Sequence, residues 1–211
     1  GTDSAGSSNS EQGSGSTGDS STSTEKYQIQ NNAVLLRNTS DIDWNELQNQ
    51  AENLYKSWTT ITLDLNTMNV TSDDILAYNT NLDNLMISLK EKNKINSAIC
   101  LANMYSLIPK YTNEISSDTT KSKLENVKSN IIFAYSIVET DRWDDILKLL
   151  GQAETDLTEL MTMKENLSTM RKPKINKAYV LLKELIKSSN DKNVDIFYLK
   201  YINLIEELDN L

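Results

Sequence analysis

The apolar residues of this chain recur at steps of three and four along almost its whole length, from Trp44 to Leu208. In the first such stretch they include Leu47, Ala51 and Leu54. This spacing places apolar side chains on one face of an α-helix, which completes a turn about every 3.6 residues. Because the pattern returns in segment after segment, the sequence predicts an all-α protein, a helical bundle of about seven helices.

Residues that cap or open helices mark where these segments start. Ser40 followed by Asp43 is a start signal of the Ser-x-x-acid type, and Thr71 followed by Asp74 repeats it. Pro173 suits the first turn of a helix, because the backbone N–H that proline lacks is not needed there. The other helices are expected from about residue 94, over about 118–139, from about 141 and from about 193.

The third helix carries apolar residues over most of its circumference, among them Ile95, Ile99 and Met104. We therefore expect it to be central in the fold. Pro109 removes one backbone donor and is expected to kink or end this helix. Segment 131–138 of the fourth helix is rich in β-branched and aromatic residues and also fits a buried strand, but the spacing upstream of it favours a helix.

The net charge and the missing residue types narrow the classes of function. The chain has 211 residues and a formal net charge of −9, so it repels the phosphates of nucleic acids, and we expect no nucleic-acid partner. It has no histidine, which removes most hydrolase, zinc and haem chemistries. Its one cysteine, Cys100, lies in an apolar run and is expected to be a buried thiol. No segment is apolar over the ~18 residues needed to span a bilayer.

The N-terminal segment 1–26 consists mainly of Ser, Gly, Thr and acidic residues, and contains no aliphatic residue larger than alanine. Such a composition predicts a disordered tether. The segment resembles the mature start of Gram-positive (Firmicutes) bacterial lipoproteins, in which a lipid-modified cysteine precedes a tether of this kind. The resemblance implies a removed signal peptide, an extracytoplasmic location and a lipid anchor, with Gly1 standing in place of the cysteine. An interdomain or vector-derived linker is the alternative.

Three short similarities recur about 100 residues apart in the expected helical domain, 27–211. Trp44 and Ala51-Glu52 resemble Trp143 and Ala153-Glu154, Ala77-Tyr78 resembles Ala178-Tyr179, and Lys92-Asn93 resembles Lys192-Asn193. They predict three-helix repeats over 41–116 and 141–211, with the fourth helix between them. The same Trp, Ala-Tyr and polar-turn spacing is similar to uncharacterised all-helical domains outside Firmicute cells, a resemblance that implies no known activity.

The acidic clusters carry no recognisable chemistry. Most of them, such as Asp73/Asp74 and Asp144/Asp145, lie where a helix is expected to begin, and acids there are stabilised by the helix dipole. No calcium loop, phosphate-binding glycine loop or catalytic Ser-His or Cys-His arrangement is present in the sequence. We therefore predict no catalytic residues, no metal ligands and no cofactor.

Three aromatic residues are the candidate partner contacts. Trp143 stands at a helix start, where it fits either the core or a partly exposed anchor for a partner. Tyr198 and Tyr201 fall off the stripe Ile196/Leu199/Ile202, which we expect to face the core. They predict an exposed aromatic patch, unless the last helix has a broad buried face.

These observations favour a non-enzymatic, lipid-anchored domain that contacts an envelope protein, a peptide or a wall component through helix faces. The alternative is a small-molecule-binding or sensory domain with an apolar pocket between the third and fourth helices. An enzyme that uses only carboxylate, Lys, Ser or Tyr groups is the least favoured hypothesis. A ligand-binding domain predicts an apolar pocket of at least ~300 Å³, whereas a contact protein predicts exposed aromatic residues.

Overall fold

The computed structural model describes residues 42–163 and 170–211. Seven α-helices and one 3₁₀ helix make up 87% of these residues, which contain no strand, so the prediction of an all-α helical bundle is confirmed. The predicted tether, residues 1–26, lies outside the described residues. The helices are α2 (Trp44–Thr67), α3 (Ser72–Lys90), α4 (Lys94–Ile115), α5 (Thr119–Ser136), η2 (Val138–Thr140), α6 (Trp143–Thr162), α7 (Arg171–Asn190) and α8 (Val194–Asp209).

Five of the seven described α-helices begin at side chains that accept hydrogen bonds from free backbone N–H groups, whereas α6 and α7 have no side-chain cap. Asp43 accepts from the N–H of Glu46 at 3.0 Å, and Thr71 accepts from that of Asp74 at 3.3 Å. The helices α4, α5 and α8 are capped in the same way by Asn93, Asp118 and Asn193. The start expected at Thr71 is therefore confirmed. Ser40 lies outside the described residues, and Asp43 is itself the cap of α2.

Pro109 does not end α4, which was one of the two outcomes expected for it, because the helix continues to Ile115. Beyond the proline, Tyr111 and Thr112 are buried against neighbouring helices. The Tyr111 hydroxyl donates to the backbone carbonyl of Asp74 in α3 at 2.7 Å. Tertiary contacts of this kind offset the one backbone hydrogen bond that a proline removes.

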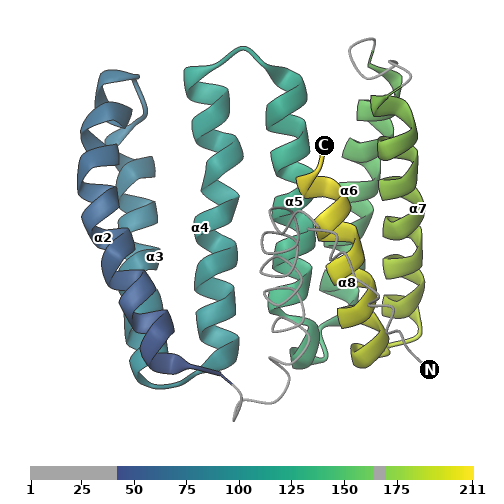
Figure 1. Ribbon diagram of the computed structural model, residues 1–211, viewed down its shortest axis with the longest axis horizontal. Coiled ribbons are helices and arrows are strands. Elements are labelled where there is room, and N and C mark those ends of the chain that lie inside the picture. Colours follow the sequence, from purple (N-terminus) through teal and green to yellow (C-terminus); the bar gives the residue numbers. More distant parts are fainter. Residues whose placement is uncertain (1–41, 164–169) are drawn as a thin grey trace, which may run out of the picture.

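The helices form two groups that meet where α4 packs against α5 (Figure 1). In the first group, α2, α3 and α4 pack one against the next. In the second, α5, α6, α7 and α8 do the same, and α8 returns to contact α5, which closes a four-helix bundle. The central position predicted for α4 is confirmed, because Ile99 packs on the core of the second group while Cys100 and Met104 are buried in the first.

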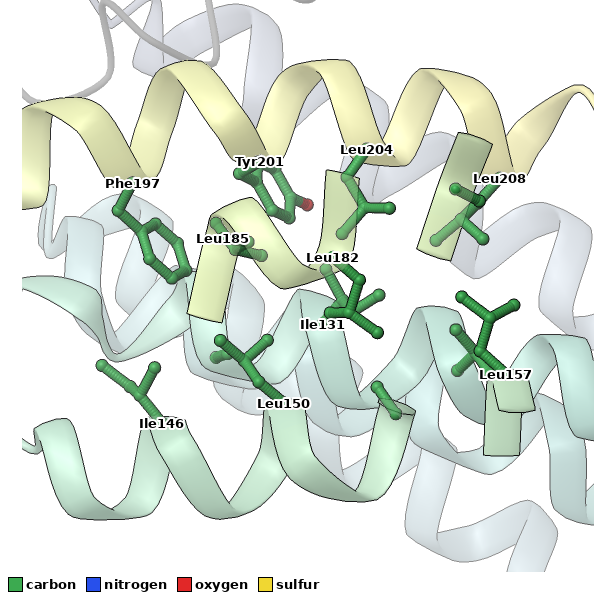
Figure 2. Close-up of a cluster of buried hydrophobic side chains, with 14 of the residues drawn as sticks. Ile131, Ile146, Leu150, Leu157, Leu182, Leu185, Phe197, Tyr201, Leu204 and Leu208 are labelled. Atoms are coloured by element: carbon green, nitrogen blue, oxygen red, sulfur yellow. The ribbon is translucent and has the colours of Figure 1, made fainter. Parts of the chain in front are cut away.

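The second group has one continuous hydrophobic core (Figure 2). Side chains of α8, such as Phe197 and Leu204, point toward Leu150 and Leu157 of α6, with side chains of α5 and α7 between them. Ile131 of α5 is fully buried in this cluster, so the fourth helix shares the core of the second group.

The first group is held by two smaller hydrophobic clusters, one towards each end. Trp44 and Leu85 belong to the cluster beside the start of α2. Trp58 belongs to the other, where its ring stacks on that of Tyr78 with the centroids 3.9 Å apart. Because these clusters are smaller than the core of the second group, we expect the first group to be the less stable of the two.

The turn between α3 and α4 has the same geometry as the turn between α7 and α8. Lys92 and Lys192 are both left-handed, with φ of 54° and 53°, and the N–H of the residue that follows each of them donates to the carbonyl of Ser88 or Ser188. In this 100-residue register four pairs of identical residues are buried at both positions: Ile75/Ile175, Leu82/Leu182, Leu85/Leu185 and Ser88/Ser188. These correspondences support the internal repeat, which as a whole stays a prediction.

Candidate functional site

A pocket of about 400 Å³, here called the inter-helical pocket, opens where the two helix groups meet. Side chains of α2, α4, α5 and α8 line it, together with two leucines of α3. From the first group it takes Leu47, Ala51, Leu54, Leu85, Leu89, Ala98 and Leu101 among others. The site lies beside the contact between the third and fourth predicted helices, and its lining is mainly apolar.

Three tyrosines form the wall of the pocket on the side of the second group. The ring of Tyr135 stacks on that of Tyr201 with the centroids 4.4 Å apart, and meets the ring of Tyr198 edge-on at 5.7 Å. Burial raises the pKa of Tyr135 to about 12, and burial also raises the pKa of Tyr201. Tyr135 and Tyr201 therefore remain neutral at physiological pH, and all three tyrosines present aromatic surface to the pocket.

One charged pair lies at the polar end of the pocket. The ammonium group of Lys94 donates to both carboxylate oxygens of Glu139, at 2.9 and 3.0 Å. Their side chains are only 13% and 22% exposed. This ion pair links the start of α4 to η2, and so joins the two helix groups. Removing both charges from water costs much of the Coulombic energy that the pair gains. Its net contribution to stability therefore depends on the geometry of its hydrogen bonds.

The structure buries all three predicted partner contacts. Trp143 is 6% exposed, Tyr198 is 3% exposed and Tyr201 is 9% exposed. The exposed aromatic patch predicted for the last helix is therefore wrong, and so is the partly exposed Trp143. The tyrosines line the inter-helical pocket, whereas Trp143 borders a separate shallow depression with Glu139 and Lys192.

The buried face of α8 differs from the one that the sequence pattern predicts. Ile196 and Leu199, which were predicted to face the core, are 42% and 56% exposed. The buried residues follow a second, equally regular spacing of four and three: Phe197, Tyr201, Leu204 and Leu208. Two helical stripes compete on this helix, and the packing of α8 on α5 and α7 selects the one that carries the larger aromatic area.

A pair of carboxyl groups between α3 and α4 was missed by the sequence reasoning. Asp74 is buried and forms an ion pair with Lys110, with 2.6 Å between the ammonium nitrogen and the carboxylate oxygen. The hydrogen bond from Lys110 lowers the pKa of Asp74 to about 2. The pKa of Glu114 is raised, chiefly because its carboxyl group shares a hydrogen bond with Asp74. Neither residue lines the inter-helical pocket. The sequence pattern Thr71-x-x-Asp74 indicates the start of a helix. It does not indicate that Asp74 meets Glu114, which lies 40 residues later in α4.

The remaining reactive groups show no assembled centre in the described part of the chain. Cys100 is buried, as predicted, and burial raises the pKa of its thiol. Across residues 42–163 and 170–211 no three His, Cys, Asp or Glu side chains are placed to hold a metal ion. Among the described helices, none is long and apolar enough to cross a membrane.

Comparison with known proteins adds no relationship to this geometry. No protein-family model matches the chain, and neither the curated proteins nor the solved structures contain a significant match.

Proposed function

We propose that this chain is a non-enzymatic binding domain which takes an apolar small molecule into the inter-helical pocket. The observation that carries the proposal is the pocket itself, which has a volume of about 400 Å³ and a mainly apolar lining. Sites for small molecules are concave, mostly apolar and about 300–1,000 Å³ in volume, with a few polar groups that fix orientation. Here they include the charged residues Lys94 and Glu139 and the neutral polar residues Gln50, Ser97 and Ser136.

The position of the aromatic residues favours a ligand over a partner protein. The residues expected to contact an envelope partner are buried, and two of them, Tyr198 and Tyr201, face the pocket instead of the surface. Tyrosine rings supply large contact area with few rotatable bonds, which lowers the entropic cost of binding. The pocket wall formed by Tyr135, Tyr198 and Tyr201 is therefore suited to hold an apolar group.

The chemistry of the lining supports binding without catalysis. The two charged groups that the described residues contribute, Lys94 and Glu139, neutralise each other through two hydrogen bonds. A general acid or base needs a pKa tuned towards the working pH and a proton within reach of its substrate. The carboxyl group with a raised pKa, Glu114, lies outside the pocket.

We also propose that the domain works outside the cell membrane, held by a lipid anchor at its N-terminus. The Ser/Gly/Thr-rich segment 1–26 supports this location. The test is detergent-phase partitioning of the native product from its own cells, followed by intact mass. Partition into detergent with a diacylglycerol-sized mass excess on an N-terminal cysteine is expected. An unlipidated product in the aqueous phase would overturn the proposed location.

Binding is tested with N-phenyl-1-naphthylamine, a neutral apolar dye whose fluorescence rises in an apolar site. The full chain is expected to bind the dye saturably. Ala98 is half-buried and lines the pocket, so Ala98→Phe places a ring inside it and is expected to weaken dye binding about tenfold. Val180→Phe, at an exposed position of α7 outside the pocket, is the matched control and is expected to leave binding unchanged.

A second pair of variants guards against misfolding of Ala98→Phe. Leu101 lies at the pocket and is 48% exposed, while Leu199 is 56% exposed and lies outside it. Leu101→Glu is expected to weaken dye binding and Leu199→Glu to leave it unchanged. Equal effects of the two substitutions would overturn the proposal.

The chain's own apolar run Ala33-Val34-Leu35-Leu36 is a competing occupant that the same assay detects. The pocket lining includes Ile42, only six residues after Leu36. Dye binding that appears only after the double substitution Leu35→Ser and Leu36→Ser would show that this run fills the site, and would overturn the small-molecule proposal.

A further inference from the structure

The two residues of the ion pair at the polar end of the inter-helical pocket differ in whether a second position is available to their side chains. This difference indicates the charge of the ligand. Among the described residues, Lys94 and Glu139 are the two charged residues of the pocket lining, one of each sign. With both present, the pocket has no net charge. A charged ligand must therefore displace one partner of the pair and take its place. The sign of the charge that the pocket accepts depends on which of the two residues has a second position available.

Glu139 has a second place available. It lines the shallow depression next to the pocket as well, together with Lys192 and Asp141, which are both exposed. A change of rotamer toward that depression takes the carboxylate from Lys94 to a site with one cationic neighbour, Lys192, and one anionic neighbour, Asp141. The cost to the carboxylate is small, because it leaves a desolvated pair for a more exposed site, where water solvates its charge.

Lys94 has no such alternative. In the part of the chain that the structure describes, Glu139 is the one carboxylate of the pocket lining, and Lys94 does not border the depression. Lys94 is also the first residue of α4, and Ile95, Ser97 and Ala98 of the same helical turn line the pocket. The positive end of the helix dipole thus adds to the ammonium charge. The ammonium group further lies 5.8 Å from the ring centroid of Tyr198, which holds it in place over the pocket wall.

The size of the pocket sets the length of the apolar part. A cavity of about 150 Å³ holds a benzene ring. By that scale, the roughly 400 Å³ of the inter-helical pocket accommodates an apolar chain of about ten to sixteen carbons. The tyrosine wall and the leucines of α2 and α3 line the space that such a chain would fill.

We propose that the ligand is a single-chain carboxylate, whose head group replaces Glu139 as the acceptor for Lys94 while its apolar chain fills the inter-helical pocket. This inference rests on the proposed function. It adds the sign of the head group, the residue that binds it and the movement of Glu139 that makes room for it.

The experiment compares three probes with the same ten-carbon chain and different head groups. Decanoate, 1-decanol and decyltrimethylammonium are each used, below their aggregation thresholds, to displace N-phenyl-1-naphthylamine from the full chain. Decanoate is expected to bind about tenfold more tightly than 1-decanol, and decyltrimethylammonium more weakly than either. The advantage of decanoate is expected to fall as salt is added, because the contact is ionic.

Substitutions assign the preference to the pair. Glu139→Gln is expected to strengthen decanoate binding about threefold or more, because Lys94 is then free, and to leave 1-decanol unchanged. The double variant Lys94→Met/Glu139→Gln leaves no unpaired charge in the lining, and is expected to bind decanoate no better than 1-decanol. Lys90→Met, at an exposed site of α3 outside the pocket, is the matched control and is expected to keep the full preference.

The outcomes separate this inference from the proposed function. Equal displacement by decanoate and 1-decanol, or tighter binding of decyltrimethylammonium, overturns the inference while the pocket stays a binding site. A preference for decanoate that survives in the double variant overturns it as well, since the head group then binds elsewhere. Failure of the neutral dye to bind the full chain overturns the proposed function itself.

Discussion

The hydroxyl of Tyr111 lies 2.7 Å from the backbone carbonyl oxygen of Asp74, so the part of α4 beyond Pro109 is tied to the first turn of α3. The bond is buried, and the ring of Tyr111 packs in the same cluster as Trp58. Tyr111, two positions after Pro109, thus supplies a tertiary contact that holds the last part of α4 against α3.

Removing this hydroxyl tests its contribution. Tyr111→Phe is expected to lower the free energy of unfolding by about 1 kcal/mol, because a buried hydrogen bond of net favourable free energy is lost while the ring remains. Tyr55→Phe is the control, since the Tyr55 hydroxyl donates to Asp83 at 2.7 Å at an exposed site and its loss costs less. Urea unfolding of both variants measures the difference, and a larger loss for Tyr55→Phe would contradict the assignment.

The carboxyl pair beside Tyr111 predicts a pH dependence of stability. One carboxylate oxygen of Glu114 is buried without a hydrogen-bond donor, and the raised pKa of Glu114 means that the folded state favours its protonated form. A raised pKa stabilises the fold below the unfolded value of 4.5, and this contribution is lost as the pH rises through the folded value. Asp74 acts in the opposite sense, because its contribution is present above 3.8 and is lost as the pH falls toward about 2.

Glu114→Gln is therefore expected to raise the melting temperature at pH 7 by about 1–2 °C, since the amide donates to Asp74 without a charge. The gain is expected to shrink toward pH 4, where Glu114 itself is protonated. Thermal unfolding followed by circular dichroism between pH 4 and pH 7 measures this. Glu52→Gln, at an exposed site of α2, is expected to show no such trend. A less stable Glu114→Gln at pH 7 would rule out the shared hydrogen bond.

The two left-handed lysines predict a stabilising substitution. Lys92 and Lys192 adopt φ of 54° and 53°, which costs a residue with a side chain roughly 1 kcal/mol and costs glycine far less. Lys92→Gly and Lys192→Gly are each expected to raise the free energy of unfolding by about 0.5–1 kcal/mol. Lys148→Gly, at an exposed position within α6, is expected to lower it by about 1 kcal/mol. Chemical unfolding of the three variants decides whether the turns have this geometry.

A pair of leucines on α8 tests which face of that helix is buried. Leu204 is fully buried in the core of the second group, whereas Leu199 is 56% exposed. Leu204→Ala is expected to cost about 2–5 kcal/mol through lost burial and the cavity left behind, and Leu199→Ala less than about 0.5 kcal/mol. The measurement is the unfolding midpoint in urea. Comparable losses would restore the stripe Ile196/Leu199/Ile202 as the buried face.

Much of this fold was predictable because the residues that start, cap and orient each helix lie close together in the sequence. The starts at Thr71, Lys94 and Asn193 follow from capping chemistry within three or four residues of each position. The apolar spacing predicted the helices and the central place of α4 for the same reason, since a helix that is apolar over most of its circumference must be covered on several sides. Of the two outcomes expected at Pro109, a kink or an end, the structure excludes the end, because contacts with α3 hold the part of α4 beyond the proline.

The amino-acid sequence by itself determined the class of the fold and most of the helix boundaries, because capping, helical spacing and turn chemistry act over a few residues. The tertiary structure decided which of two stripes on α8 is buried, which carboxyl groups meet, and that three tyrosines and an ion pair surround one pocket. Those outcomes depend on residues from different helices, such as Lys94 and Glu139, which lie 45 positions apart in the chain and 2.9 Å apart in space. No spacing within one helix contains that information, because it is the packing of α4 on α5 that brings these side chains together.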